Sequence, residues 1–144
     1  MIDDNLELAL ACRADGLHVG QNDMEASEAR RLLGPDRILG VTAKTVDQAR
    51  KAQAAGADYL GVGAMFHTGT KLDAEEVSRE AAQEITAAVD IPVVAIGGIN
   101  KKNILELKGT GVDGVALVSA IFGAENIEEE CKTLKALSAE MVQA

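Results

Sequence analysis

The sequence has almost no aromatic residues and no cluster of basic ones. Aromatic side chains make up 2% of the 144 residues, tryptophan is absent, and the formal net charge at pH 7 is −9. A nucleic-acid surface needs cations for the phosphate backbone and rings on which bases stack. We therefore expect no nucleic-acid partner, and an anionic ligand must be held locally by backbone N–H groups, a few cations or a bridging metal.

Cysteine and long apolar runs are scarce as well. The two cysteines, Cys12 and Cys131, have no CxxC or histidine-rich context, which predicts buried free thiols in a reducing compartment. No apolar run approaches the roughly 20 residues that cross a bilayer, and no segment resembles a signal peptide. We expect a cytoplasmic protein without a membrane partner. Its 47% hydrophobic content suffices for one core, so residues 1–144 are expected to form a single domain.

What the sequence does contain is a repeated unit in which a helix is followed by a strand. Three segments share small residues, an aspartate and then an apolar run: ACRADGLHVG (11–20), AAGADYLGVG (54–63) and GTGVDGVALV (109–118). The shared aspartates are Asp15, Asp58 and Asp113. RILGVTA and IPVVAIGG add two more strand patterns, which makes five. Helical spacing lies between them, over residues 6–12, 25–33, 46–55, 75–89, 101–108 and 127–142.

Apolar strands that alternate with helices predict a parallel sheet covered by helices, and hence the α/β class. A closed (β/α)₈ barrel and an open doubly wound sheet are the two candidate architectures, and five strands are too few to close the barrel. In both architectures, ligands bind at the carboxyl ends of the strands. The residues that follow each predicted strand are therefore the place to look for a site.

Small or polar residues follow every predicted strand, in GQND (20–23), TAKT (42–45), FHTGTK (66–71), GGIN (97–100) and VSA (118–120). The glycines of GGIN let a backbone approach a phosphate, and VSA offers a second open strand end. The hydroxyls of Thr68 and Thr70 and the ammonium of Lys71 would face the same region. The combination predicts a phosphate site, although loops that only turn the chain are polar too.

Carboxylates that could serve as ligands occur at Asp3, Asp4 and Asp23. Asp4 and Asp23 have a structural alternative, because each precedes a predicted helix that it could cap. If they instead project from adjacent strand ends, they form the open oxygen pair that Mg²⁺ uses when it also holds a diphosphate. We expect His18, inside a strand, to be packed or hydrogen-bonded, and assign neither it nor His67 as a general base.

Five motifs in order resemble the C-terminal part of thiamine phosphate synthase, a (β/α)₈ TIM-barrel enzyme: DGLHVGQNDM, ILGVTAKT, GADYLGVGAMFHTGTKLDA, IPVVAIGGIN and GVALVSAI. The resemblance covers nearly the whole chain and begins near the end of the family's third strand. It therefore implies a barrel truncated to about its last five βα units. It also implies transfer of a hydroxymethylpyrimidine group from its diphosphate to thiazole phosphate, with release of pyrophosphate, in thiamine biosynthesis. The family's dissociative route needs charge stabilisation more than a base.

The resemblance further implies roles for single residues. Asp4 and Asp23 would hold Mg²⁺, and Thr42 and Lys71 would act catalytically on the pyrimidine diphosphate. The implied substrate-binding residues are Asp3, Thr68, Thr70, Gly98 and Ser119. Asp3 stands where the family commonly has an asparagine that reads the pyrimidine. His67 and Gly69 depart from the family pattern, where a proline and a hydroxyl or acidic residue are usual.

Two other functions stay open. A thiazole tautomerase relative would need a histidine after the sixth strand of the barrel, where this chain has Ala64. An inactive or partner-dependent half-barrel that only binds phosphate ligands is the second, because the family's basic diphosphate-binding segment has no counterpart in this sequence. Unpaired strand edges near Val19 and Leu117 would favour association with another chain, and so a homo-oligomer.

Overall fold

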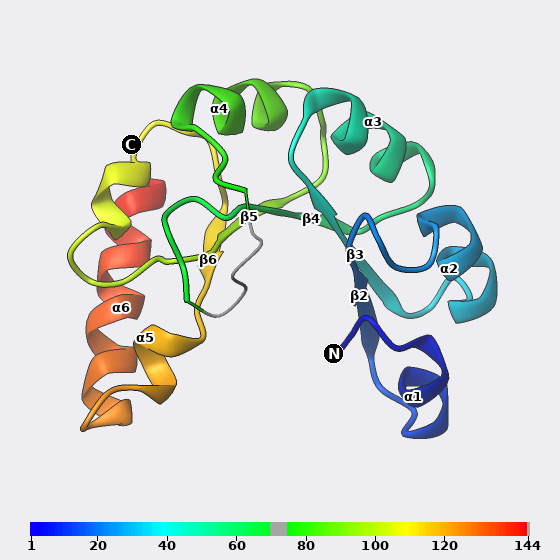
Figure 1. The fold of residues 1–144 in the computed structure, drawn as a ribbon, viewed down its shortest axis with the longest axis horizontal. Coiled ribbons are helices and arrows are strands. Elements are labelled where there is room, and N and C mark those ends of the chain that lie inside the picture. The colour runs from blue at the N-terminus through cyan, green and yellow to red at the C-terminus, as the bar shows by residue number, and fades with distance from the viewer. Residues whose placement is uncertain (70–74, 144) are drawn as a thin grey trace.

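The computed structural model describes residues 1–69 and 75–143, and in these ranges the chain forms one sheet of six parallel strands. The strands follow one another in chain order across the sheet: β1 (Ile2–Asp3), β2 (Gly16–Val19), β3 (Ile38–Ala43), β4 (Tyr59–Val62), β5 (Val93–Ile96) and β6 (Gly114–Ala116). The sheet bends into an arc with the helices around its outside (Figure 1). The predicted α/β class and the parallel order are thus confirmed.

The helices are α1 (Leu6–Ala11), α2 (Ala26–Leu33), α3 (Val46–Ala54), α4 (Arg79–Ala87), the 3₁₀ helix η1 (Ile104–Leu107), α5 (Ser119–Phe122) and α6 (Ile127–Val142). Side chains that accept backbone N–H groups fix several of their starts. Asn5, Thr45, Ser78 and Asn126 cap α1, α3, α4 and α6 in this way. No helix within the described ranges is long and apolar enough to span a membrane.

The prediction of five strands was wrong by one, because β1 was missed. β1 has only two residues and ends in a carboxylate, so its sequence carries no strand pattern. It forms because it pairs with β2, with Ile2 opposite Leu17 and Asp3 opposite His18. The predicted free edge near Val19 is therefore wrong as well. Among the described strands, the sheet ends at β1 on one side and at β6, next to Leu117, on the other.

The predicted helix over residues 101–108 is also corrected, to a single short 3₁₀ helix. The Asn103 side chain accepts the Asn100 N–H at 2.8 Å, and the Asn100 side chain accepts the Lys102 N–H at 2.9 Å. Such local side-chain bonds offer the backbone an alternative to the helical ladder. The helix over 75–89 likewise begins later than predicted, at Arg79, because Ser78 caps it.

Successive residues of each strand point alternately to a buried convex face and to a more open concave face of the sheet. Residues under the helices are buried and apolar, and they line up across the sheet through Val19, Val41, Leu60 and Val93. The intervening positions point to the concave face, where the register places polar and small residues side by side: His18, Gly40, Thr42, Tyr59 and Gly61. The strands are therefore not apolar throughout, and the concave face is where chemistry can occur.

The repeated aspartates clamp the amino ends of the strands. The Asp58 N–H donates to the Leu39 carbonyl at 2.8 Å, and its carboxylate accepts the Leu39 N–H at 2.7 Å. Asp113 repeats both bonds with Val93, each at 2.8 Å. Asp15 differs, because its backbone carbonyl accepts the N–H of Ile38, in the following strand, at 2.9 Å. The repeat that is visible in the sequence is thus a strand-pairing device at the end of the sheet opposite to the predicted site.

The prediction of buried free thiols is half correct. Both cysteines are free, but Cys12 is exposed and Cys131 is only partly buried. Cys12 follows the last turn of α1 as its C-cap residue, where the chain leaves the helix. The helix predicted over residues 6–12 thus ends one residue earlier, at Ala11.

Candidate functional site

A hydrogen-bonded network joins three neighbouring strands on the concave face. His18 Nδ1 lies 2.8 Å from the Tyr59 hydroxyl, and His18 Nε2 lies 2.9 Å from Thr42 Oγ1. The three residues come from β2, β4 and β3, respectively, and all are half-buried. The expectation of a hydrogen-bonded His18 is confirmed, and its partner Thr42 is one of the predicted catalytic residues.

Two glycines make room for these side chains. A Cβ on Gly40 would collide with the Tyr59 ring, and a Cβ on Gly61 would lie 3.0 Å from His18 Cε1. The rings of His18 and Tyr59 lie side by side, with centroids 5.5 Å apart and planes inclined by 41°. The glycines therefore set how close the rings lie to the sheet, and the network covers the middle of the concave face.

Thr42 is held through its backbone as well as its side chain. Gln21, in the turn that follows β2, donates from its side-chain amide to the Thr42 carbonyl at 2.6 Å. The His18 contact and the Gln21 contact both come from β2 and its following turn. The carboxyl end of β3 is therefore fixed against the carboxyl end of β2.

The surroundings of Tyr59 favour the protonated form of its phenol. Burial raises the pKa of Tyr59 above its ordinary value, and the nearby negative charge of Asp3 raises this pKa further. Asp3 lies opposite His18 in the β1–β2 register, on the same concave row. The predicted substrate-binding residue Asp3 therefore belongs to the surroundings of the network, although it is exposed.

Asp4 and Asp23 follow two adjacent strands, and neither is a helix cap. The Asp4 N–H donates to the His18 carbonyl at 2.8 Å, and the Asp4 φ of 62° lies in the left-handed region. Asp23 closes the turn after β2, because its carboxylate accepts the Gly20 N–H at 2.7 Å. The caps are Asn5 for α1 and Glu25 for α2. The capping alternative is therefore wrong for both aspartates, and the adjacency on which the metal hypothesis depends is present.

The loops after β4 and β5 touch each other through backbone atoms. The N–H groups of Met65 and Phe66 donate to the carbonyls of Ile96 and Gly97, at 2.9 and 3.1 Å. Gly98 has a φ of +65°, and a Cβ there would meet the carbonyl oxygens of Phe66 and His67. The close approach of the two loops thus explains why residue 98 is a glycine, independently of its predicted phosphate contact.

The other predicted phosphate ligands within the described ranges follow β4 and β6. Thr68 is half-buried in the loop after β4, and Ser119 is exposed at the first residue of α5, two residues after Leu117. His67 is almost fully exposed and lies 3.8 Å from Glu76 Oε1. Thr70 and Lys71 fall outside the described residues, so their predicted roles stay predictions.

Sequence reasoning missed Tyr59 and Gln21 as members of the site. The available signal was the alternation along each strand, which places Tyr59 on the same face as Gly61 and His18 on the same face as Gly16. The cross-strand register that brings His18 between Thr42 and Tyr59 depends on the pairing of three strands, so no single segment of the sequence predicts it. Gln21 gave no signal of its own in a turn where any polar residue is ordinary.

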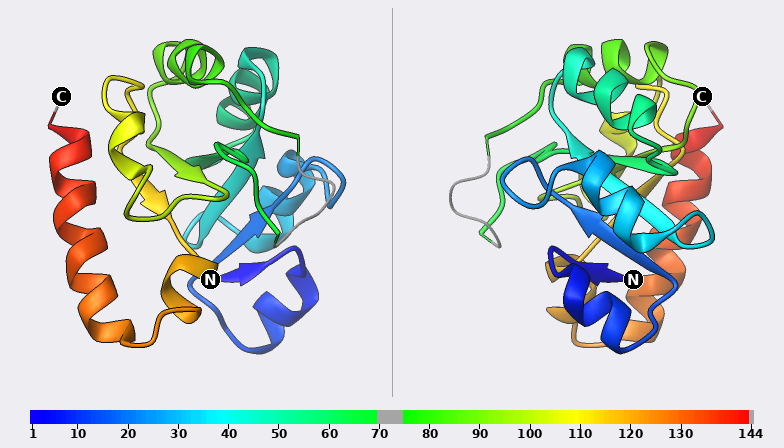
Figure 2. Two further views of the ribbon diagram at one scale, coloured as in Figure 1. Left: turned by 60° about the vertical axis from the view of Figure 1, so that its left-hand side comes forward. Right: turned by 90° about the vertical axis from the view of Figure 1, so that its right-hand side faces the viewer.

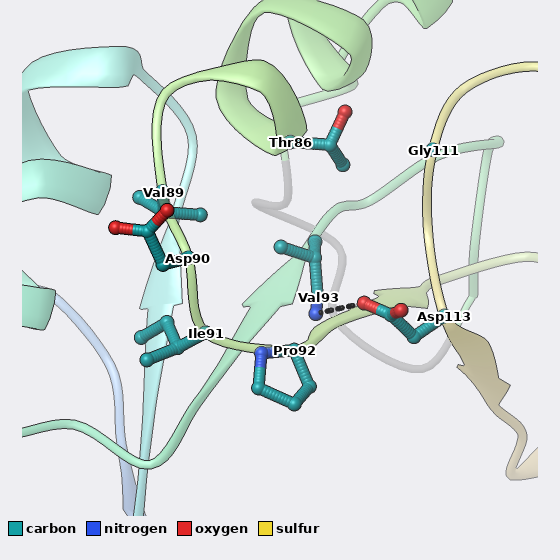
Figure 3. A pocket seen from close by; sticks show the side chains of 8 residues that line it. All are labelled: Thr86, Val89, Asp90, Ile91, Pro92, Val93, Gly111 and Asp113. Atoms are coloured by element: carbon teal, nitrogen blue, oxygen red, sulfur yellow. Dashed lines mark hydrogen bonds between the residues drawn. The ribbon is translucent and has the colours of Figure 1, made fainter.

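Two pockets of the described structure lie away from this network. One of about 250 Å³ is lined by Thr86, Asp90, Val93 and Asp113 at the amino ends of β5 and β6, where the Asp113 carboxylate accepts the Val93 N–H (Figure 3). It belongs to the strand clamp described above. A groove of about 460 Å³ runs between β6 and α6, with Val115, Leu117 and Leu134 in its lining. Figure 2 shows α6 at the margin of the fold, beside this last strand.

Comparisons with known proteins agree with the motifs. A family model described as thiamine monophosphate synthase matches residues 1–121. The thiamine-phosphate synthase of Clostridium tetani is 51% identical over 134 residues, which cover 93% of this chain and 64% of that protein. Thiamine phosphate pyrophosphorylase from Pyrococcus furiosus has a TM-score of 0.87 at 41% identity, over 97% of this chain and 67% of that one.

A more distant solved structure shares the fold alone. The structure of 3-hexulose-6-phosphate synthase matches with a TM-score of 0.70 at 16% identity, over 92% of this chain and 66% of that one. The chain spans 64% of the length of the Clostridium tetani relative. The resemblance that the five motifs indicate is thus confirmed across nearly all of this chain.

Proposed function

Since the chain belongs to the thiamine monophosphate synthase family, we propose that its strand ends form part of the active site of an enzyme that makes thiamine phosphate. The reaction transfers the hydroxymethylpyrimidine group from its diphosphate to thiazole phosphate and releases pyrophosphate. The observation that carries the proposal is the network on the concave face, in which Thr42, near the carboxyl end of β3, is held by His18 and Gln21. The product would enter thiamine biosynthesis, and the proposed location is the cytoplasm.

In the proposed site, charge stabilisation takes the place of a nucleophile or base. Thr42 and Lys71 contact the diphosphate, whose negative charge grows as the bond to the pyrimidine breaks. Asp3 lies on the row that would meet the pyrimidine. The thiazole phosphate is assigned to the loops after β4, β5 and β6, through Thr68, Thr70, Gly98 and Ser119. Close packing of the first two loops at Gly98 supports this assignment.

The carboxylates present fit Mg²⁺ as a partner of a bound diphosphate. Asp4 and Asp23 offer oxygen ligands from adjacent strand ends, which are the donors that Mg²⁺ prefers. Residues 1–69 and 75–143 contain no group of three or more histidine, cysteine or acidic side chains that could hold a metal. A pair of carboxylates leaves coordination positions to water and phosphate oxygens. The ion would neutralise charge on the diphosphate, so we propose binding only when a diphosphate is present.

We further propose that the described sheet is part of a (β/α)₈ barrel, with six rather than five of its βα units. The open arc and the 64% coverage of the Clostridium tetani relative support this view. In that case the outer edge of β6, with the apolar groove beside it, is covered by a chain or segment outside the described sheet. We expect the 144-residue protein to form a dimer or larger homo-oligomer, which size-exclusion chromatography with light scattering would detect; a monomer would contradict this expectation.

Turnover with both substrates and Mg²⁺ tests the function. We expect the described six-stranded sheet alone to be poorly active and a version that contains a complete barrel to be active, because loss of even one charge-stabilising donor costs roughly 10²–10³ in rate. Equal rates would contradict the partial-barrel proposal. No activity in either version would favour the alternative, a half-barrel that only binds phosphate ligands.

Binding measurements test the two ligand sites separately. Calorimetry with thiazole phosphate should show weaker binding to a Thr68→Val variant, with Thr133→Val on the exposed side of α6 as the matched control. For the metal, Asp23→Asn keeps an oxygen that can accept the Gly20 N–H and removes the charge. We expect it to lose Mg²⁺ binding in the presence of pyrophosphate, whereas Asp36→Asn should not. An unchanged Mg²⁺ affinity in Asp23→Asn would count against the carboxylate pair.

A further inference from the structure

His18 lies between two hydroxyl groups, and this position restricts where the protons can be. A neutral imidazole has one nitrogen that donates and one that accepts. In a neutral His18, the contacts to Tyr59 and Thr42, at 2.8 and 2.9 Å, therefore run in one direction through the ring. Either the phenol donates to Nδ1 and Nε2–H donates to Thr42, or both bonds run the opposite way.

Acidity decides between the two directions. A phenol, with an ordinary pKa of about 10, is more acidic than an aliphatic hydroxyl and is therefore the stronger hydrogen-bond donor. Tyr59 is therefore the better donor and the poorer acceptor of the two. Burial and then the charge of Asp3 raise the pKa of Tyr59, so the phenol keeps the proton that it donates. The favoured arrangement has the Tyr59 hydroxyl donating to Nδ1 and Nε2–H donating to Thr42.

From this arrangement we propose that His18 is a positioning residue that directs the Thr42 hydroxyl proton outward from the carboxyl end of β3, toward an anionic oxygen. A threonine oxygen that already accepts one hydrogen bond is held in place, and its own proton remains available for a ligand. Phosphate and diphosphate oxygens accept hydrogen bonds, and charge-assisted bonds of this kind are the stronger ones. Tyr59 acts through His18 as the origin of the relay.

Two further contacts fit this role. Gln21 fixes the Thr42 carbonyl at 2.6 Å, so backbone and side chain are both held and little freedom is lost when a ligand binds. Gly61, beside Thr42 in the β3–β4 register, leaves the space that the His18 ring occupies. The inference rests on the proposed function for the identity of the anion, but not for the direction of the hydrogen bonds.

Nitrogen-15 NMR of the histidine side chains, at a pH where the nitrogen shifts show a neutral imidazole, tests the direction itself. The sequence has two histidines, so a His67→Ala variant assigns the His18 signals. We expect His18 to carry its proton on Nε2, and a Tyr59→Phe variant to lose this preference because the donor to Nδ1 is gone. A proton on Nδ1 of the wild-type His18 would overturn the proposal.

Binding of inorganic pyrophosphate, with Mg²⁺ present, tests the consequence. We expect about tenfold weaker binding for Thr42→Val and for His18→Leu, and the double variant should be no weaker than Thr42→Val alone. His18→Gln, which keeps an N–H near the Nε2 position, should recover part of the affinity. Additive losses in the double variant would refute a role through Thr42. Melting temperatures of all variants separate this outcome from simple unfolding.

The outcome is independent of turnover. If the wild type forms no thiamine phosphate under any condition, the proposed function fails, while the tautomer and the pyrophosphate titration still decide the role of His18. If turnover is present, His18→Leu should raise the KM for the pyrimidine diphosphate or lower kcat, and His18→Gln should reverse part of the change. A His18→Leu enzyme with wild-type kcat and KM would overturn the proposal.

Discussion

Replacing Gly98 with alanine should destabilise the protein more than replacing Gly109, although both glycines have a left-handed φ. Gly98 has a φ of +65°, and its added Cβ would lie 2.6 Å from the Phe66 carbonyl oxygen, closer than real Cβ atoms approach backbone. Gly109 has a φ of +78°, and nothing lies within 4 Å of an added Cβ. The pair therefore separates the cost of backbone conformation from the cost of close packing.

The expected losses follow from these two terms. A left-handed conformation costs a residue with a Cβ about 1–2 kcal/mol, and this should be the whole loss for Gly109→Ala. Overpacking adds about 1–3 kcal/mol for Gly98→Ala, because the clash is with backbone that carries the loop after β4. The total for Gly98→Ala is then about 2–5 kcal/mol, a sizeable share of the stability of a typical domain.

Equilibrium urea unfolding, followed by far-ultraviolet circular dichroism, measures both free energies of unfolding. With a denaturant slope of about 1–3 kcal/mol/M, the extra loss in Gly98→Ala should appear as a clearly lower midpoint than that of Gly109→Ala. Equal losses would refute the reasoning, because they would mean that the loops after β4 and β5 do not meet at Gly98. The assigned thiazole phosphate site would then lose the packing that supports it.

Two other predictions concern side chains away from the site. Arg30→Met should lower the free energy of unfolding in urea by about 2–4 kcal/mol, because the half-buried guanidinium donates to the backbone carbonyls of Gly34, Arg37 and Gly56. The control Arg31→Met removes an exposed ion pair with Glu28 and should lower it by less than about 1 kcal/mol. Similar losses in the two variants would contradict this prediction. Glu25 caps α2, and hydrogen bonds from the Ser27 hydroxyl and then the Glu28 N–H lower the pKa of its carboxyl below its ordinary value. A carboxyl whose pKa is lower in the folded state than in the unfolded state stabilises the fold at pH values above its unfolded-state pKa. This stabilisation is lost as the pH falls through the folded-state pKa. The stability difference between wild type and Glu25→Gln should therefore be present at pH 7 and shrink below about pH 4.5; a difference that grows on acidification would argue against the cap.

The sequence by itself determined the class and order of the fold. Alternating helical and apolar segments predicted a parallel α/β arrangement, and the strand order follows the chain. It also placed the polar residues that follow each strand, and it predicted a hydrogen-bonded His18. These inferences worked because they depend on local rules: the period of a strand or helix, and the short crossover that keeps parallel neighbours in chain order.

The tertiary structure decided the features that depend on cross-strand partners. β1 is a strand only because β2 pairs with it, and no pattern within Ile2–Asp3 could reveal that. Asp4 and Asp23 look like helix caps in the sequence, yet neighbouring residues cap both helices and the aspartates lie beyond adjacent strand ends. The network of Tyr59, His18 and Thr42 joins residues up to 41 positions apart, through a register fixed by burial of the opposite face. Register is a property of the whole sheet, which is why the sequence could indicate members of the site but not their contacts.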